Sequence, residues 1–434
     1  MIRPAPALVW LVGLISMPLG IAVAVWPEMH PFLWLALLLL TVVCGVDAWY
    51  GRTRLEGFSA FSNDDGQMAQ AREAALTIHL RKPVGLAGSG VAGLALPPSF
   101  VCEAEEVALA LAEGQTEYAM TWRMTPRERG RYPLRELFVS LASPLRLWDC
   151  GRGLALGVEV KVFPDAGKYG SLLARVRGQM GARLIRQVGK GREFEKLREY
   201  TAGDGFDEIH WKATARRGTP VTKVYQTERM QEIYAVIDVS RLMARRFGEN
   251  SALDEYLRVA LLLGTAAEQR GDRFGVILFH REVSRFLRAR NGKAHYAACR
   301  QAMFDAQPEP VPADFFELAA FLRARVPKRS LLFLLTALDE PSAATSLDKA
   351  ATLLGQRHLP YVVMLQPGGV APVLAAPPDE DLYAGLAGHL QWRALREMEM
   401  SLRKHGVRFH MVEPGALAAK VLMLYEEVKQ RQLL

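Results

Sequence analysis

The side chain best suited to acid–base chemistry is His210, which lies in the stretch Ile209-His210-Trp211-Lys212. Asp204 and Asp207 precede it, and a carboxylate that orients an imidazole is a recurring part of hydrolytic sites. A hydrolase that uses His210 with Asp204 or Asp207 is therefore one hypothesis. Against it, the sequence near His210 has no His-Glu-x-x-His, Cys-x-x-Cys or Gly-x-Ser-x-Gly pattern to supply a metal or a nucleophile.

The same stretch is also rich in groups that recognise partners. Its candidate contact residues are Arg198, Asp204, His210, Trp211, Lys212 and Arg216. The functional interpretation is a cationic surface that docks an acidic partner loop. The structural interpretation is a packed Trp211, a satisfied imidazole at His210 and an ion pair between Arg198 and Asp204. The usual roles of these residue types favour the structural interpretation. The charge count does not decide between the two, because the nine Lys or Arg from Gly181 to Arg217 only slightly exceed the six Asp or Glu.

These residues are part of a longer pattern. The fixed positions are Gly191-Arg192-Glu193-Phe194, Leu197-Arg198-Glu199-Tyr200, Gly203-Asp204, Ile209-His210-Trp211-Lys212, Ala215-Arg216 and Val236-Ile237-Asp238-Val239-Ser240. The pattern closely resembles the signature of a bacterial family known as domain of unknown function 58. The resemblance extends over nearly the whole chain. It implies a transmembrane pair, a β-rich middle and a von Willebrand factor A-like end, in a protein that works beside AAA+ ATPases of the MoxR type.

Asp238 and Ser240 follow an apolar run, in Asp238-Val239-Ser240-Arg241-Leu242-Met243. This segment resembles the first loop of the metal-ion-dependent adhesion site of von Willebrand factor A domains, Asp-x-Ser-x-Ser. The resemblance implies Mg²⁺ held by carboxylate and hydroxyl oxygens. Leu242, however, offers no oxygen where that pattern has its second serine.

The other ligands of such a site are also incomplete. No Ser or Thr lies between Ser284 and Ser330 to provide the threonine of the pattern, whereas Asp339, with Thr336 before it, remains as the last acidic group. We therefore expect no metal and no cofactor to be tightly held. Instead, Asp238 and Ser240 are predicted to form a loop that bonds its own backbone amides.

Composition excludes several classes of function. The chain of 434 residues carries a formal charge of +8, yet it has no basic run with interleaved aromatics that would follow nucleic acid. Gly189-Lys190 is followed by Gly191 where a phosphate-binding loop needs Ser or Thr. The cysteines Cys44, Cys102, Cys150 and Cys299 are too widely spaced for a zinc site or a disulfide framework.

Two apolar runs open the chain, and each is long enough to cross a bilayer. They are residues 7–26 and 32–50, joined by a short link without Lys or Arg. Arg3 precedes the first run, while Arg52 and Arg54 follow the second, so the positive-inside rule places both ends in the cytoplasm. A cleaved signal peptide ending near Ala24 is the alternative. Asp47 lies where a carboxylate can reach the interface.

The middle of the chain alternates with a period near two. A polar segment at 55–74 is predicted to be a tether, and short runs at 76–80, 107–110, 118–124, 138–141 and 158–162 predict a β-sandwich. Gly88-Ser89-Gly90-Val91-Ala92-Gly93 fits a dinucleotide fingerprint. Because Pro97 and Pro98 prevent the helix that such a site needs, we interpret these glycines as a loose turn.

The last 200 residues predict a doubly wound α/β domain. Its predicted strands are 233–237, 274–279, 331–335, 361–365 and 408–412, and its predicted helices are 253–270, 293–306, 315–325, 343–357, 382–404 and 416–430. The helix from Leu382 is expected to face the core with Trp392, Leu395, Met398 and Leu402.

The sequence therefore predicts a transmembrane hairpin (1–54), a β-sandwich (55–165), a linker with the signature (166–232) and a von Willebrand factor A-like domain (233–434). The expected function is that of an inner-membrane, two-pass adaptor with cytoplasmic domains. Its expected partners are the bilayer and, by resemblance, a MoxR-type AAA+ ATPase. The candidate partner-binding residues are Arg198, Asp204, His210, Trp211, Lys212, Arg216, Asp238 and Ser240. The hydrolase remains the alternative.

Overall fold

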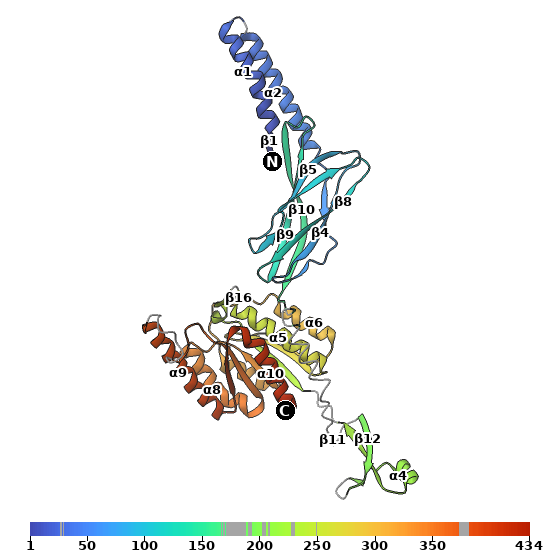
Figure 1. Cartoon of the computed structure of the whole chain (residues 1–434), viewed down its shortest axis with the longest axis vertical. Helices are drawn as coiled ribbons and strands as arrows, with labels where there is room; N and C mark the ends of the chain where they lie inside the picture. Colours follow the sequence, from blue (N-terminus) through green and yellow to red (C-terminus); the bar gives the residue numbers. More distant parts are fainter. Residues whose placement is uncertain are drawn as a thin grey trace. The chain divides into compact units, whose positions relative to one another are not determined.

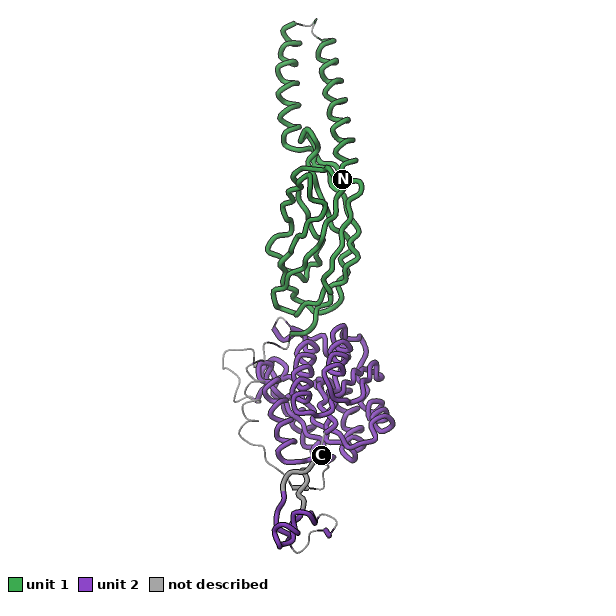
Figure 2. Tube along the Cα trace, turned by 90° about the vertical axis from the view of Figure 1, so that its right-hand side faces the viewer, with its two compact units in different colours: residues 1–165 green, residues 166–434 purple. Residues whose placement is uncertain are grey.

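The computed structural model describes residues 1–26, 28, 30–165, 167, 170, 188–189, 193–201, 205–206, 209–226, 231–248, 250–372 and 382–434. Asp204 and Asp207 lie outside these residues. The chain forms two compact units, Met1–Asp165 and Ala166–Leu434 (Figure 2).

The first unit begins with two apolar helices, α1 (Pro6–Val25) and α2 (His30–Thr53) (Figure 1). Both are long and apolar enough to cross a membrane. Their large side chains face outward: Trp10 is 80% exposed and Leu14 is 74% exposed. A helix pair that buries so little of its apolar surface within the protein is suited to a lipid environment.

Both ends of this hairpin are bonded to the strands that follow. The N-terminal strand β1 (Ile2–Pro4) pairs antiparallel with β10 (Trp148–Phe163). In α2, Asp47 is buried, and its carboxylate accepts hydrogen bonds from Ser143 Oγ at 2.5 Å and Leu145 N at 2.9 Å. Asp47 thus joins α2 to the β region, and it is not the free carboxylate that we expected from the sequence.

Two sheets form the rest of the first unit and enclose one core. One has the order β1-β10-β9-β5-β7 with β3 also on β10, and the other has the order β2-β4-β8-β6. The remaining strands are β2 (Ser59–Phe61), β3 (Gln67–Ala69), β4 (Ala74–Arg81), β5 (Gly88–Leu94), β6 (Phe100–Cys102), β7 (Glu106–Leu111), β8 (Glu117–Pro126) and β9 (Gly130–Ala142). Trp122 from one sheet and Leu137 from the other are both buried in this core, as alternating apolar residues predict.

Two predictions for this region were wrong. The glycine-rich segment is strand β5, which lies between β9 and β7, and it is not a loose turn. Glycine is required there because a Cβ on Gly90 would come within 2.2 Å of the Ser140 carbonyl oxygen. The expected tether at 55–74 contains β2 and β3 and buries Leu55 and Phe58, so it is part of the folded unit.

The signature residues of the second unit form a small three-stranded sheet with one helix. The sheet order is β11-β13-β12, from β11 (Val188–Gly189), β12 (Glu193–Glu199) and β13 (Val221–Gln226). Helix α4 (Trp211–Arg217) precedes β13 and ends at Gly218, whose φ of 72° suits glycine. We call residues 193–226, as far as they are described, the signature module.

The larger sheet of the second unit has six strands in the order β18-β17-β14-β19-β20-β21. The strands are β14 (Glu232–Asp238), β17 (Arg273–Phe279), β18 (Val283–Arg290), β19 (Leu331–Leu335), β20 (Leu359–Leu365) and β21 (Arg408–Val412). All neighbours are parallel except β17 and β18. The chain proceeds in one direction from β14 to β18 and then resumes on the other side at β19, which creates a switch point between β14 and β19.

Helices cover both faces of this sheet, as the near-continuous apolar strands require. They are α5 (Ala252–Gln269), α6 (Lys293–Met303), α7 (Phe315–Arg325), α8 (Pro341–Arg357), α9 (Leu382–Lys404) and α10 (Leu417–Arg431). One core joins the sheet to α5, α6 and α10, and the other joins it to α7, α8 and α9. In α9, Leu395 and Leu402 are buried, and Trp392 and Met398 pack beside them, as predicted. Short strands β15 (Arg246–Phe247) and β16 (Asn250–Ser251) and the 3-10 turns η4 (Arg241–Ala244) and η6 (Pro414–Ala416) complete the unit.

Candidate functional site

The switch point brings together residues that lie far apart in the sequence. Asp238 ends β14, and Thr336 directly follows β19, its parallel neighbour. Ligands of doubly wound sheets bind at the carboxyl ends of strands at such a position. This is therefore where a ligand of the α/β unit would be expected.

Asp238 is fully buried and bonded within the protein. Its Oδ1 accepts a hydrogen bond from Ser240 N at 2.7 Å, and its Oδ2 accepts one from Thr336 Oγ1 at 2.7 Å. Burial raises the pKa of the carboxyl group, while these hydrogen bonds act in the opposite direction. The bond to the Ser240 amide is the local backbone contact that the sequence predicted. The carboxylate holds two loops together.

Asp339 is also close to the switch point, but its side chain forms an ion pair with Arg245. The Asp339 side chain is 4% exposed and that of Arg245 is 40% exposed, so the guanidinium closes the carboxylate off from solvent. Beside it, Arg241 pairs with Glu340. Among the described residues, no group of three His, Cys, Asp or Glu side chains is placed to hold a metal ion. The positive charge that faces the Asp339 carboxylate is therefore the guanidinium of Arg245.

Two polar atoms at this position have no hydrogen-bond partner among the described residues. They are Ser240 Oγ and Asp339 Oδ1, and both are buried. Leu242, in the place of the second serine of the adhesion-site pattern, packs against the core. The structure therefore brings Asp238, Ser240 and Thr336 together, whereas Asp339 is taken up by Arg245.

Sequence analysis missed two residues of this cluster. Arg245 lies only a few residues beyond the Asp-x-Ser segment, but nothing in the sequence indicates its ion pair with Asp339. Tyr256 is buried in the apolar face of α5; its hydroxyl donates to the Thr336 carbonyl oxygen and accepts from Leu365 N, both at 2.8 Å. Burial raises the pKa of Tyr256, so it remains a neutral brace between β19 and β20.

In the signature module, His210 caps helix α4. Its Nδ1 accepts a hydrogen bond from Ala213 N at 3.1 Å, and its backbone N–H donates to the Val221 carbonyl oxygen at 2.8 Å. An N-cap acceptor satisfies one of the free amides that begin a helix. The imidazole thus has a structural task, as one of the sequence interpretations expected. The proposed partners of His210 in a hydrolase, Asp204 and Asp207, lie outside the described residues.

The prediction that Trp211 packs in a core was wrong. The Trp211 side chain is 67% exposed, and Phe206 in the same module is 76% exposed. Lys212 and Arg216 on α4 are exposed as well. Trp211 opens α4, a helix of seven residues of which none is buried, so its indole has no packed helix face to join. Arg198 Nη1 bonds Thr201 Oγ1 at 2.5 Å, and its predicted pairing with Asp204 lies outside the described residues.

Three solved structures show distant similarity to this chain. A conserved hypothetical protein, BatB from Bacteroides thetaiotaomicron, is 14% identical with a TM-score of 0.32 and covers 45% of this chain and 99% of its own. A protein of unknown function from Porphyromonas gingivalis W83 is 12% identical with a TM-score of 0.17, covering 24% and 44%. The CARDB domain of a Pyrococcus furiosus protein is 11% identical with a TM-score of 0.15, covering 24% and 93%.

The sequence comparisons are more informative for the second unit. No curated protein matches the chain. Residues 196–366, which include Trp211, Asp238 and Asp339, match the model of the family described as Protein of unknown function DUF58.

Proposed function

We propose that this chain is a membrane-anchored adaptor whose soluble units face the cytoplasm. There it docks a MoxR-type AAA+ ATPase during the assembly or maturation of other proteins. The observation that carries the proposal is the exposure of Trp211 beside Lys212 on the signature module. Tryptophan and arginine dominate the energetics of protein interfaces, and a monomer gains little by leaving an indole in water.

The state of the potential catalytic groups supports binding over catalysis. Asp238 is buried and bonded to Ser240 and Thr336, and His210 accepts a helix amide. A general base has to reach a proton on the substrate, and a nucleophile needs such a base beside it. Both side chains are instead committed to holding their own loops.

Anchoring and orientation follow from the first unit and from the charges that flank its helices. Helices α1 and α2 satisfy the length and hydropathy requirements for a bilayer span. Arg3 lies before α1, and Arg52 and Arg54 lie at the end of α2, which favours a cytoplasmic position for both ends. The hydrogen bonds of Asp47 then keep the β sheets against the same side of the bilayer.

The α/β domain is best described in this proposal as von Willebrand factor A-like. Its strand order and the position of Asp238 at the switch point support that description. In this domain the Arg245 guanidinium pairs with Asp339 and takes the place of the Mg²⁺ ion of an adhesion site. Docking of a partner therefore does not depend on Mg²⁺.

A capture experiment tests the proposal. The tagged full-length chain is purified from detergent-solubilised membranes, and the captured proteins are identified by mass spectrometry. We compare native protein, Trp211→Ala and the matched variant Phe316→Ala, which removes a 56% exposed aromatic ring on α7. Native protein and Phe316→Ala should recover a MoxR-type ATPase, and Trp211→Ala at least about tenfold less, as expected for a tryptophan hot spot.

Two results would contradict the adaptor. One is equal recovery of the ATPase with Trp211→Ala. The other is turnover of a generic ester or phosphate substrate by the purified chain that is lost in both His210→Ala and His210→Asn. The second variant keeps a side-chain oxygen that is able to cap α4, so it separates loss of catalysis from loss of the helix cap.

A further inference from the structure

β21 is the last strand of the sheet in the part of the chain that the structure describes. β21 pairs with β20 on one side, and no described strand pairs with its other side. Gln366 N donates to the Val412 carbonyl oxygen at 2.8 Å, so the backbone polar groups of Val412 point inward. Because successive residues of a strand alternate, the N–H and C=O groups of Phe409 and Met411 point outward. An unpaired edge of this kind is a template for another strand.

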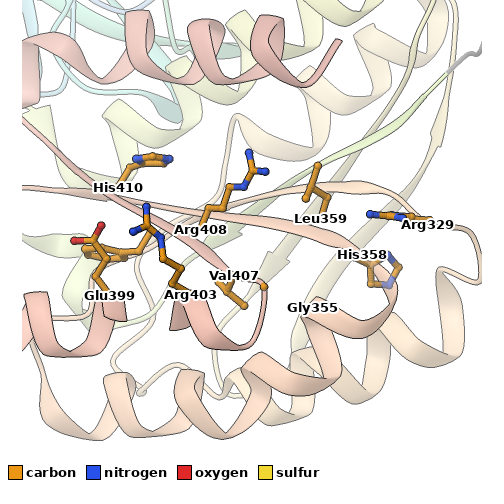
Figure 3. Close-up of a pocket in the computed structure, with 11 residues that line it drawn as sticks. Arg329, Gly355, His358, Leu359, Glu399, Arg403, Val407, Arg408 and His410 are labelled. Atoms are coloured by element: carbon orange, nitrogen blue, oxygen red, sulfur yellow. The ribbon is translucent and has the colours of Figure 1, made fainter. Parts of the chain in front are cut away.

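A groove follows this edge, and Figure 3 shows the residues that line its first cavity. It consists of two cavities of about 380 and 430 Å³ that share Glu399, Phe409 and His410. Phe409 belongs to the core on the α9 side of the sheet, and His410 stacks on Tyr361 on the opposite side. The second cavity is lined by Trp392 of α9 and by Lys420 of α10, which cover opposite faces of the sheet, so it lies against the outer edge of β21. The first cavity continues to the amino ends of β19 and β20, where Arg329, His358 and Leu359 lie.

The groove is mainly cationic. Its charged lining residues are Arg329, Arg396, Glu399, Arg403, Arg408 and Lys420. The only carboxylate among them, Glu399, accepts a hydrogen bond from Arg396 Nη1 at 2.6 Å. The close-up of the first cavity shows Arg329 on one side and Arg403 beside Glu399 on the other (Figure 3). Arg396 and Lys420 line the second cavity, so the positive charge is spread along the groove.

One wall residue lacks the partner that its burial requires. His358 is 4% exposed, and neither ring nitrogen has a hydrogen-bond partner among the described residues. Burial, with a contribution from Arg357, lowers its pKa from 6.5 to about 4, so the ring is neutral at pH 7. A buried polar group without a partner is costly, and a polar ligand in the groove would supply one.

We propose that this groove binds an extended acidic segment of a partner polypeptide, which adds to the sheet as a strand beside β21. Backbone bonds to Phe409 and Met411 supply affinity in such strand addition, and adjoining pockets supply specificity. Distributed arginines suit carboxylates spaced along a strand better than a single compact anion. This binding does not depend on the proposed docking of an ATPase at the signature module.

The test uses the full chain in lipid nanodiscs and a fluorescent, capped ten-residue peptide of alternating Glu and Val, followed by anisotropy. The peptide should bind at least about tenfold more tightly than its Lys-Val counterpart. Arg403→Gln should weaken binding several-fold. Arg393→Gln is the matched control, because Arg393 lies on the same helix, is 69% exposed and pairs with Glu397 outside the groove.

Two further measurements distinguish strand addition from simple charge attraction. A peptide N-methylated at every Glu and a peptide N-methylated at every Val should bind with different affinities, because only one of the two sets of amides faces β21 and donates hydrogen bonds to it. Amide-resolved hydrogen exchange should show protection of Phe409 and Met411 on binding. Three results would overturn the proposal: no preference for the acidic peptide, equal binding of both N-methylated peptides, or full competition by inorganic phosphate at the peptide's own concentration, which would indicate a small-anion site.

Discussion

Polar groups gather at two places on the α/β sheet, the switch point between β14 and β19 and the outer edge of β21. At the switch point Asp238 bonds Ser240 N and Thr336, and Arg245 neutralises Asp339. In the groove beside β21, Arg329 and Arg403 lie with His358, whose ring nitrogens have no hydrogen-bond partner among the described residues. The first place carries the ligand-binding pattern, yet the protein's own side chains fill it. The comparison shows that residue type alone does not identify a binding site. The polar side chains must also be free to contact a ligand, and those at the switch point are bonded to one another.

The largest loss of stability should come from removing the Asp238 carboxylate, which bonds two loops at the switch point. Asp238→Ala leaves the Thr336 hydroxyl and the Ser240 amide buried without their acceptor. We expect a loss of about 2–4 kcal/mol in the free energy of unfolding, from two unsatisfied donors. Urea unfolding of the detergent-solubilised chain measures it, and the exposed Glu282→Ala in the same domain should change stability by less than about 0.5 kcal/mol. A loss in Asp238→Ala as small as that of the control would mean that the switch point is not a brace.

The pH dependence of the unfolding free energy should have opposite signs at the two places. The pKa of His358 is lowered from 6.5 to about 4, so its contribution to stability is present above pH 6.5 and is lost as pH falls toward 4. His358→Gln should remove up to about 3 kcal/mol of this pH dependence, measured as the difference from native protein between pH 7 and pH 4.5. Identical pH profiles would show that His358 is solvated and that the groove wall is not as dry as its burial indicates.

Asp238 should behave in the opposite way. Its pKa is raised above the ordinary 3.8, so the stability it contributes is fully present below that value and is lost as pH rises through the raised pKa. Asp238→Asn does not ionise and should flatten this part of the profile in unfolding experiments from pH 3.5 upward. A variant whose stability still falls with rising pH over that range would assign the dependence to another group.

The fold of the second unit was largely predictable because its signals are local. The buried strands at Ile233–Ile237 and Leu331–Leu335 are continuous apolar runs, and the helices between them show a regular apolar stripe. β18 was missed because its sequence, VSRFLRAR, is that of a charged edge strand, half exposed and without a clear alternation. Strand β5 was missed because its glycines usually indicate turns, whereas here Gly90 allows close packing against Ser140.

The candidate site was less predictable because it depends on long-range contacts. The position of Asp238 at a strand end follows from the sequence, but its bond to Thr336 joins residues 98 positions apart. The exposure of Trp211 was not predictable either, because no local pattern shows whether an indole at the start of a short helix faces a core or solvent. The groove beside β21 draws on Arg329, His358 and Arg403, three segments that only the sheet order brings together.

The smallest of the expected effects tests whether Arg245 takes the place of a cation. Arg245→Ala leaves the Asp339 carboxylate without its ion pair and should cost about 1–2 kcal/mol in unfolding free energy, because water partly replaces the exposed guanidinium. The freed oxygens of Asp339 and Ser240 then suit Mg²⁺, so 10 mM Mg²⁺ should restore about 1.4 kcal/mol in the variant if the ion binds with a Kd of about 1 mM.

The matched variant is Arg241→Ala, which breaks the neighbouring pair with Glu340. Arg241 is 51% exposed, so this change should cost less than about 1 kcal/mol and should confer no response to Mg²⁺. Native protein should likewise be indifferent to the ion, because the guanidinium already neutralises Asp339. If native protein gained as much from Mg²⁺ as Arg245→Ala does, the arginine would not occupy the cation's place. The switch point would then be open to ligands, and the contrast with the β21 groove would no longer hold.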